Sequence, residues 1–488
     1  VQPADPSTQP DRRMILRSGR GPTTTLLTPL RRACSSTTAC LRAEIAALKA
    51  QLTSLGSVPV TAPKPGEQSF FAGAASEYTT ELKFFNPHVD DTPPTLPCFR
   101  LINDMGEVCP GAELPDIDKE TAMAMQITMV RVSEFDKVFN DAQRQGRISF
   151  YLTGRGEEAC SVASAAALSD EDFILPQYRE LGAAFWRGFT FEDTANQLCS
   201  NSLDPAKGRQ LPLHIGDRSK RFFYVKSTLG TQCPHAVGAA KALRLMGQRS
   251  VALTYFGEGC ASEGDIPSAL NIAAVHKAPA IFFCRNNGYA ISTQVSDQYR
   301  GDGVAPRGLA FGMPAIRVDG NDPFAVYAAV RRAREMALEG AGTPALVEAM
   351  TYRIGAHSTS DDDSKYRNPE SPEPGWDSER AYWESRSPII RFGRYLQAQG
   401  WYDGQQEEEL RKQARRDAIR SLNSAQRVGK PHSMHLFSDV YDEVPWNLEE
   451  QEQALLEHMQ KYPSSYTEHI ESNAKELERA GAVTSPYA

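Results

Sequence analysis

One carboxylate flanked by glycines follows an apolar run in "YFGEGCASEGD", residues 255–265. The carboxylate is Glu258, and the run before it, "VALTYF" (251–256), has the composition of a buried strand. A second polar cluster, "RNNGYAIST" (285–293), follows the next apolar run, "AIFFC" (280–284). A tight turn that happens to carry an acid would explain either segment alone. Two such segments after successive strands favour a backbone that comes close to a ligand.

The oxygen atoms of these segments suit a magnesium ion that also binds phosphate. The Glu258 carboxylate, the Asn287 amide and a backbone carbonyl are hard ligands, but they are too few for an all-protein calcium site. Mg²⁺ takes such a set when phosphate oxygens and water complete its octahedron. The helix predicted from Ser262 would favour an anion at its N-terminus. Three glycines would let the backbone approach a diphosphate: Gly257, Gly259 and Gly288. Two unrelated turns remain the alternative.

The elements that must position these groups alternate between strand and helix. Strands are predicted at 148–152, 172–176, 251–256, 280–287, 315–320 and 345–354. Helices are predicted at 119–146, 156–168, 232–247, 262–277 and 322–339. This alternation predicts an α/β fold with a parallel sheet and helices on both faces. Ligands of such sheets bind at the carboxyl ends of the strands.

Length and charge limit the function classes. The 488 residues have room for one large core, and a net charge of −8 argues against nucleic acid as the main partner. No run of about 18 apolar residues is present, so we expect no membrane span. The nine cysteines are widely spaced without a CxxC pair, which favours reduced thiols over a zinc site.

The N-terminal segment differs in composition from the rest. Residues 12–43 contain arginines, serines and threonines but no acid, which is typical of an organelle transit peptide, with a disordered basic tail as the alternative. We predict a transit peptide and disordered linker at 1–68, a catalytic domain with an N-terminal extension at 69–386, and a helical region at 387–488. That last region reads as solvent-exposed helices or a subunit contact.

The pair "GEG…NN" resembles the thiamine diphosphate motif, whose commoner form begins Gly-Asp-Gly. Longer strings, among them "YFGEGCASEGD", "IFFCRNNGYAIST", "RVDGNDPFAVY" and "EAMTYRIGAHSTSDD", resemble one family closely. The family comprises the alpha subunits of the thiamine-dependent, decarboxylating component of branched-chain 2-oxo acid dehydrogenase complexes. The resemblance runs from about Glu81 to Lys461. Glu258 in place of Asp, with the sequence around the Asn pair, favours branched substrates over pyruvate.

The resemblance implies the thiamine-diphosphate-binding fold and oxidative decarboxylation of the 2-oxo acids of Leu, Ile and Val, with acyl transfer to a lipoyl group. It implies thiamine diphosphate and Mg²⁺ as cofactors and the mitochondrial matrix as location. The implied partners are a beta subunit in an α2β2 heterotetramer, a lipoyl-bearing transacylase core, and a regulatory kinase and phosphatase. A pyruvate-type alpha subunit, a NAD-dependent dehydrogenase and a non-catalytic scaffold are the alternatives. The NAD-dependent dehydrogenase lacks support because no GxGxxG motif follows an early strand.

The resemblance also assigns residues. Mg²⁺ would be held by Glu258, Asn287 and the backbone carbonyl of Tyr289. The cofactor would be contacted by Tyr178, Arg179, Ser227, Leu229, Gly257, Glu258, Gly259, Cys260, Arg285, Asn287, Tyr289 and His357. His357 would be catalytic, because an imidazole that titrates near neutral pH can bind phosphate and take part in proton transfer.

Two further expectations follow from the resemblance. Ser358, in a polar loop predicted to be mobile (357–375), would be a phosphorylation site, and its added charge would disorder the loop. The family binds K⁺ through a loop that here reads "KSTLGTQ". Thr231 and Gln232 match its ligands, but Lys226 replaces a serine. We therefore hypothesise that the Lys226 ammonium takes the place of K⁺, which leaves K⁺ a doubtful cofactor.

Overall fold

The computed structural model describes residues 95–340, 342–367, 369–370, 372 and 377–467. The predicted transit peptide and the boundary at 68/69 lie outside these residues.

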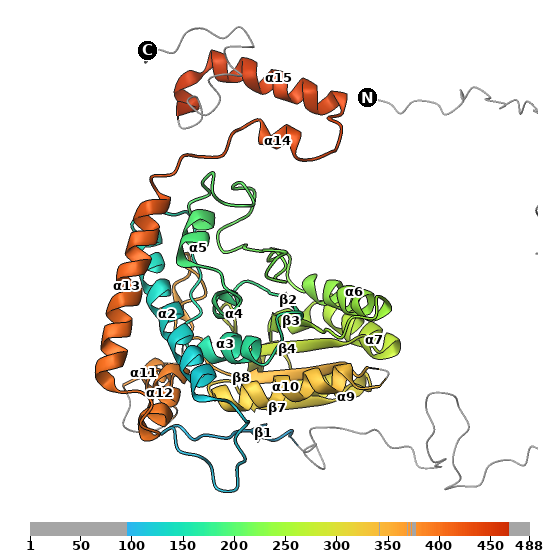
Figure 1. The fold of residues 1–488 in the computed structure, drawn as a ribbon, viewed down its shortest axis with the longest axis vertical. Helices are drawn as coiled ribbons and strands as arrows, with labels where there is room; N and C mark the ends of the chain where they lie inside the picture. The colour runs from blue at the N-terminus through green and yellow to red at the C-terminus, as the bar shows by residue number, and fades with distance from the viewer. Residues whose placement is uncertain (1–94, 341, 368, 371, 373–376, 468–488) are drawn as a thin grey trace, which may run out of the picture. The chain divides into compact units, whose positions relative to one another are not determined.

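A six-stranded parallel sheet forms the centre of the fold, with strand order β1-β7-β8-β4-β3-β2 (Figure 1). The strands are β1 (Cys98–Phe99), β2 (Phe173–Leu175), β3 (Ala252–Gly257), β4 (Ala280–Asn286), β7 (Ala315–Asp319) and β8 (Ala345–Met350). A two-stranded antiparallel ribbon, β5 (Tyr289–Ala290) and β6 (Thr293–Gln294), follows β4. The predicted α/β fold with a parallel sheet is confirmed.

Helices connect and surround the strands. They are α2 (Lys119–Arg144), α3 (Glu158–Ala166), α4 (Leu181–Trp186), α5 (Phe191–Leu198), α6 (Gln232–Leu245), α7 (Asp265–His276), α8 (Val295–Gln298), α9 (Ala305–Ala310), α10 (Pro323–Leu338), α11 (Glu379–Ser385), α12 (Pro388–Ala398), α13 (Gly404–Ala425), α14 (His435–Ser438) and α15 (Trp446–Lys461). None of these helices is long and apolar enough to cross a membrane.

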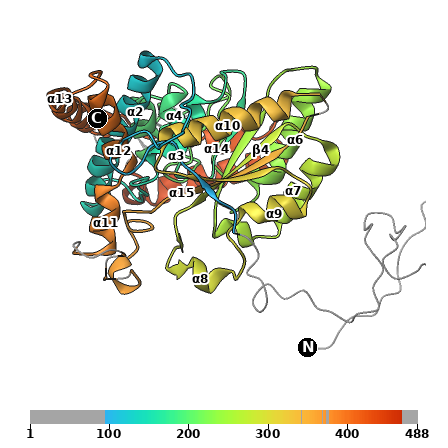
Figure 2. The same cartoon turned by 90° about the horizontal axis from the view of Figure 1, so that it is seen from below.

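Successive residues of the central strands enter two separate cores. Leu253, Tyr255 and Phe283 pack with residues of α2, α3 and α10. Phe256 and Phe282 pack with residues of α6 and α7. In Figure 2, α10 accordingly lies on one side of β4, and α7 and α9 lie on the other. Because both faces are covered, the strands read as unbroken apolar runs.

One predicted strand is absent. Residues 148–152 form no strand but an irregular segment beside α2. The Asp136 carboxylate of α2 accepts hydrogen bonds from the Tyr151 hydroxyl (2.8 Å) and the Gly154 amide (2.7 Å). The backbone of Tyr151 pairs with Thr359 and not with a strand: its amide donates to Thr359 Oγ1 (3.3 Å), and its carbonyl accepts from the Thr359 amide (3.1 Å).

Within the described residues, the segment 387–467 contains the helices α12 to α15, and the proposed boundary at 386/387 falls between α11 and α12. Helix α12 packs against α2 and α3, and α13 packs against α2 and α5. The seven cysteines of the described residues carry free thiols.

Asp322 joins the start of α10 to the segment after β1. Asp322 is the N-cap of α10, and its fully buried carboxylate accepts from the amides of Phe324 (3.0 Å) and Ala325 (3.1 Å). It also accepts from the amides of Leu101 (2.6 Å) and Ile102 (2.8 Å). Four backbone donors therefore depend on one side chain.

We expect Asp322→Ala to lower the free energy of unfolding by about 3 kcal/mol or more, because four buried N–H groups lose their acceptor. Urea unfolding followed by circular dichroism measures this loss. Asp403→Ala, at the exposed N-cap of α13, is the matched control and should cost about 1 kcal/mol. Equal losses in the two variants would contradict this account of Asp322.

Candidate active site

The register between β3 and β4 brings the two polar segments together. Gly257, the last residue of β3, pairs with Arg285 of β4. Glu258 and Asn287 therefore lie side by side after the two strands, and the backbone amide of Asn287 donates to Glu258 Oε2 at 3.2 Å. The two polar segments that follow successive predicted strands are therefore neighbours.

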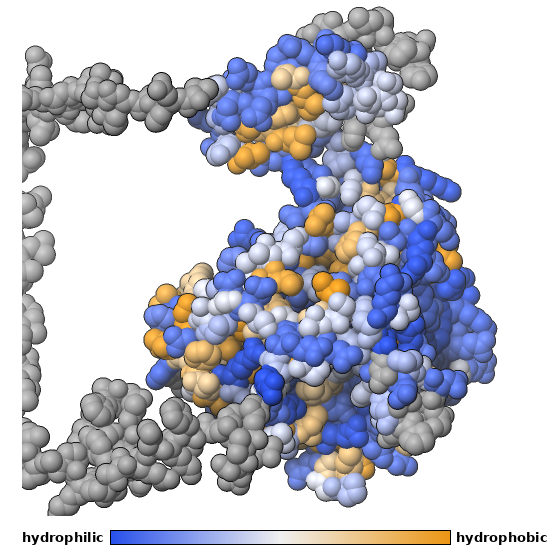
Figure 3. Space-filling view, turned by 180° about the vertical axis from the view of Figure 1, so that it is seen from behind, coloured by the Kyte–Doolittle hydropathy of each residue, from blue (hydrophilic) through white to orange (hydrophobic). Residues whose placement is uncertain are grey.

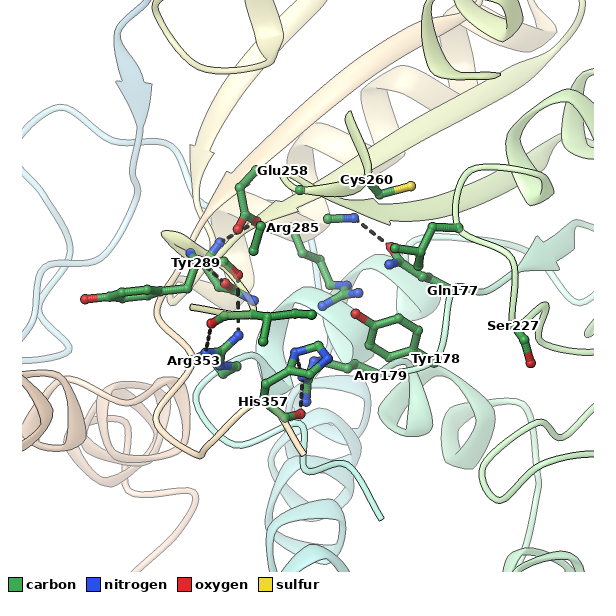
Figure 4. Close-up of a pocket in the computed structure, with 16 residues that line it drawn as sticks. Gln177, Tyr178, Arg179, Ser227, Glu258, Cys260, Arg285, Tyr289, Arg353 and His357 are labelled. Atoms are coloured by element: carbon green, nitrogen blue, oxygen red, sulfur yellow. Dashed lines mark hydrogen bonds between the residues drawn. The ribbon is translucent and has the colours of Figure 1, made fainter. Parts of the chain in front are cut away.

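A cavity of about 350 Å³ opens at these strand ends (Figure 4). All the residues predicted to contact the cofactor line it: Tyr178, Arg179, Ser227, Leu229, Gly257, Glu258, Gly259, Cys260, Arg285, Asn287, Tyr289 and His357. Four further residues line it that the sequence did not single out: Gln177, Ala290, Ile291 and Arg353. The volume lies in the range of small-molecule sites.

Glu258 is a buried carboxylate with an unused oxygen. Its side chain is 1% exposed, and Oε1 has no hydrogen-bond partner among the described residues. Burial raises the pKa of Glu258 to about 7. A carboxylate in this position is costly unless a cation approaches it.

Asn287 and Tyr289 can complete a partial set of oxygen ligands. Asn287 Oδ1 accepts from the Tyr289 backbone amide (3.2 Å), and the Tyr289 carbonyl accepts from Arg353 Nη1 (3.4 Å). In Figure 4 the Tyr289 ring points away from the cavity. No group of three or more His, Cys, Asp or Glu side chains in the described residues could hold a metal ion. A metal held by Glu258 and Asn287 would therefore need ligands from a bound molecule or water.

Two glycines allow the loops after β3 and β4 to meet. A Cβ atom on Gly259 would lie 2.6 Å from the Ala290 Cβ, so a side chain there would separate the loops. Gly288 adopts a φ of +86°, which favours glycine.

Arg285 lies between two buried carboxylates. Its Nη1 donates to Glu157 Oε2, and its Nε forms an ion pair with Glu180 Oε1 at 2.7 Å that lacks hydrogen-bond alignment. All three side chains are at most 2% exposed. Burial opposes the charge of Glu157, but the charges of Arg285 and Arg179 and the hydrogen bonds from Arg285 and Asn287 together outweigh it and lower the pKa of Glu157. The sequence did not indicate this arrangement, since acids at a helix start are common.

His357 is held by Arg179. The Arg179 guanidinium donates to His357 Nδ1 (3.1 Å), to the His357 carbonyl (2.6 Å) and to the Thr153 carbonyl (2.6 Å). Because arginine can only donate, the neutral imidazole carries its proton on Nε2. Burial, and then the charges of Arg179 and Arg353, lower the pKa of His357 to about 3. The expectation of an imidazole that titrates near neutral pH is therefore wrong for the ligand-free chain.

Ser227 is paired with a histidine that sequence reasoning left without a role. His214 Nδ1 contacts the Pro212 carbonyl (3.0 Å), so this nitrogen must carry the proton. His214 Nε2 then accepts from the Ser227 hydroxyl (2.7 Å). The Ser227 oxygen keeps its acceptor capacity for a ligand.

The candidate cation loop is partly suited to its role. The buried Gln232 donates to the Tyr255 carbonyl (2.9 Å), while its Oε1 has no partner among the described residues. The Thr231 hydroxyl donates to the Thr228 carbonyl (3.0 Å). Lys226 is exposed and has no assigned partner in the described part of the chain. The structure thus offers Gln232 Oε1 as an acceptor for either an ammonium or a metal cation.

In the described part of the loop predicted to be mobile, residues 357–367 make several hydrogen bonds with one another and with the residues before them. Asp361 accepts from the His357 amide (2.7 Å) and the Tyr366 hydroxyl (2.5 Å). Arg367 donates to the carbonyls of Arg353 (2.5 Å) and Gly355 (2.6 Å). Ser358 is half-buried and lines a neighbouring polar cavity instead of the candidate active site.

Arg353 also supports an unusual backbone conformation. Ile291 has a φ of +56°, which is strained for a β-branched residue. Its carbonyl accepts from Arg353 Nη2 at 2.7 Å. Such strain occurs often at functional sites, and the β-branched residue gave no signal of it in the sequence.

We expect Glu258→Gln to raise the free energy of unfolding of the cofactor-free chain by about 2 kcal/mol above pH 7. The pKa of Glu258 is about 7 in the folded chain and near 4.5 when exposed. The destabilisation is therefore complete above pH 7, declines below it, and vanishes below about 4.5. Urea unfolding at pH 8 and pH 5 in the presence of a chelator measures the difference.

Glu263→Gln, at an exposed acid five residues further on, is the control and should have little effect at either pH. A destabilised Glu258→Gln chain, or a gain that does not depend on pH, would contradict the burial of an unpaired carboxylate.

Sequence comparison relates the chain to known enzymes. The family described as "Dehydrogenase E1 component" matches residues 125–434. The 2-oxoisovalerate dehydrogenase subunit alpha 2, mitochondrial, of Arabidopsis thaliana is 44% identical over 81% of this chain and 82% of its own length. The human 2-oxoisovalerate dehydrogenase subunit alpha, mitochondrial, is 45% identical over 81% of this chain and 86% of its own. The Caenorhabditis elegans protein of that name is 44% identical over 80% and 88%.

The family match covers more than half of the chain, and these relatives align with most of it at 44–45% identity. The chain therefore belongs to the dehydrogenase E1 component family.

Proposed function

We propose that the chain is the alpha subunit of 3-methyl-2-oxobutanoate dehydrogenase (2-methylpropanoyl-transferring), EC 1.2.4.4. It takes part in the oxidative decarboxylation of the branched-chain 2-oxo acids of Leu, Ile and Val, with acyl transfer to a lipoyl group. The mitochondrial matrix is its proposed location, since the relatives are named mitochondrial. The alternative of a pyruvate-type alpha subunit is less favoured, because these relatives are named 2-oxoisovalerate dehydrogenases.

The observation that carries the proposal is the unsatisfied oxygen of Glu258 beside Asn287, inside a cavity lined by arginines. The family depends on thiamine diphosphate, and these residues fit that cofactor. Above pH 7 the three carboxylates of Glu157, Glu180 and Glu258 balance the three guanidinium groups of Arg179, Arg285 and Arg353. A diphosphate would add uncompensated negative charge to this balanced site unless a divalent cation accompanied it. We therefore propose Mg²⁺ bound by Glu258, Asn287 and the Tyr289 carbonyl.

When bound, thiamine diphosphate supplies the electron sink for decarboxylation. The chain's own residues would bind this cofactor and orient it in the cavity. Arg179 is fixed by Thr153 and His357, so its guanidinium keeps one orientation in the cavity. The His357 ring lies beside Tyr178 (Figure 4), with ring centroids 6.2 Å apart. Its Nε2–H is the proton that His357 can offer to an anionic oxygen. A diphosphate nearby would raise the pKa of His357 and make it a stronger base.

The proposed partner subunit has exposed apolar surfaces available to it. Figure 3 shows hydrophobic residues gathered over α6 and α7 and over α14 and α15. Exposed side chains there include Leu245, Met246, Val275, Leu436, Val440, Tyr441 and Trp446. Such patches mark protein contacts. They support an α2β2 heterotetramer with a beta subunit, which docks on a lipoyl-bearing transacylase core. We also propose the division of the chain into a catalytic domain at 69–386 and a helical C-terminal region at 387–488.

Ser358 is the proposed site of control by a kinase and a phosphatase. A phosphate adds about −1.5 to −2 charges at neutral pH. The Asp361 amide already donates to the Ser358 carbonyl (3.1 Å), so the added charge would lie near the Asp361 carboxylate. Repulsion between them would weaken the bonds from His357 and Tyr366 that hold the loop.

The chain co-expressed with its beta partner should decarboxylate 3-methyl-2-oxobutanoate much faster than pyruvate, and only with thiamine diphosphate and Mg²⁺. A dye acceptor reports the turnover. His357→Ala should lower kcat about 100-fold, because a positioned acid–base group contributes that much. His276→Ala, at the exposed end of α7, is the control. A preference for pyruvate would move the substrate assignment, and absence of cofactor-dependent turnover in a folded tetramer would refute the proposal.

We propose that the Lys226 ammonium takes the place of K⁺ beside the free Oε1 of Gln232. Turnover should then be equal in potassium and in choline buffers. In Lys226→Ser, which restores the ligand type of the family, K⁺ should increase turnover. A wild-type enzyme that is inactive without K⁺ would contradict this proposal.

A further inference from the structure

Glu157 contacts two groups of the candidate site at once. Its Oε1 accepts from Asn287 Nδ2 at 3.0 Å, and its Oε2 accepts from Arg285 Nη1. The side chain is 2% exposed and does not line the cavity among the described residues. Glu157 therefore acts on a ligand through its hydrogen bonds to Asn287 and Arg285, and through its charge on Glu258 and Arg179.

The position of Glu157 in the chain makes this arrangement informative. Glu157 is the N-cap residue of α3, a position where Ser, Thr, Asp or Asn commonly accepts from the first amides of the helix. Here it makes no such bond. Both oxygens turn to the end of β4 instead, so the carboxylate serves the site and not its own helix.

The contact determines which atom of Asn287 faces the cavity. A carboxylate can only accept hydrogen bonds, so the Asn287 atom that faces Glu157 must be the NH₂ group. The amide oxygen is then left for the cavity side. The opposite orientation would present an NH₂ group, which cannot bind a metal ion.

We infer that Glu157 is a positioning residue for the metal site: it orients the Asn287 amide so that Oδ1 can bind Mg²⁺, and it anchors Arg285 beside it. This inference rests on the proposed Mg²⁺–diphosphate site. Partners of this kind commonly change metal affinity 10- to 100-fold.

Glu157→Gln keeps the size of the side chain at position 157 but should change the orientation of the Asn287 side-chain amide. The introduced amide has one acceptor and one donor. Arg285 carries a full charge and takes the acceptor, so the donor faces Asn287. The Asn287 amide must then turn, which removes its oxygen from the metal. Adding Asn287→Asp to Glu157→Gln exchanges the carboxylate and the amide. The new carboxylate at position 287 can accept from the new amide and still present an oxygen to the metal.

The test is Mn²⁺ binding to the αβ tetramer, stripped of metals and saturated with thiamine diphosphate. The electron paramagnetic resonance signal of free Mn²⁺ reports binding without any turnover. We expect Glu157→Gln to weaken Mn²⁺ binding about 10- to 100-fold, and the double variant to regain most of that loss. Glu158→Gln is the matched control. Glu158 is an equally buried acid that accepts from the Gly156 amide and contacts neither Asn287 nor Arg285.

The outcomes separate the two proposals. A wild-type tetramer that binds no Mn²⁺ with thiamine diphosphate refutes the proposed function. Tight binding by wild type with unchanged binding by Glu157→Gln overturns the inference alone. If Glu157→Gln does not assemble, the double variant decides: binding near that of wild type supports the orienting role, and lost binding in a folded double variant refutes it.

Discussion

The site depends on the buried ion pairs that Arg285 forms with Glu157 and Glu180. Glu157 stands at the start of α3, Glu180 stands at the start of α4, and Arg285 lies near the end of β4. Their ion pairs join these three elements where the cavity opens. Removing these charges from water is costly, so loss of one partner would leave another buried and unpaired. The strand ends and helix starts are therefore held in one arrangement before any ligand arrives.

Function conflicts with stability at Glu258. Among the described residues, its buried carboxylate has one oxygen without a hydrogen-bond partner and forms no ion pair with a side chain. A chain selected for stability alone would place an amide or an apolar residue there. A bound cation would compensate the charge of this buried carboxylate. The same cation would offset the charge of an anionic ligand that binds beside Arg179 and Arg285. The low pKa of His357 has another cause, which is burial first and then the nearby charges of Arg179 and Arg353.

The sequence predicted the fold and the centre of the site because these depend on local patterns. Apolar runs marked β3 and β4, and polar residues directly after them placed Glu258 and Asn287 at neighbouring strand ends. No local pattern distinguishes Tyr178, Arg179 and His357, so only the resemblance to a known family assigned them to the site. Glu157 was missed because an acid at a helix start looks ordinary. The false strand at 148–152 arose because the backbone of Tyr151 pairs with the distant Thr359 and not with a strand. The pKa of His357 depends on Arg179 and Arg353, which meet it only in the folded chain.

The most direct test of the central claim is the affinity of the tetramer for thiamine diphosphate with and without Mg²⁺, measured by titration calorimetry. If Glu258 and Asn287 hold a metal that bridges to the diphosphate, the cofactor should bind at least about 100-fold more weakly without divalent cations, since a lost bridge between buried charges costs several kcal/mol. Equal affinity in the two conditions would show that the arginines alone hold the diphosphate. It would also leave the buried carboxylate of Glu258 without the role assigned to it.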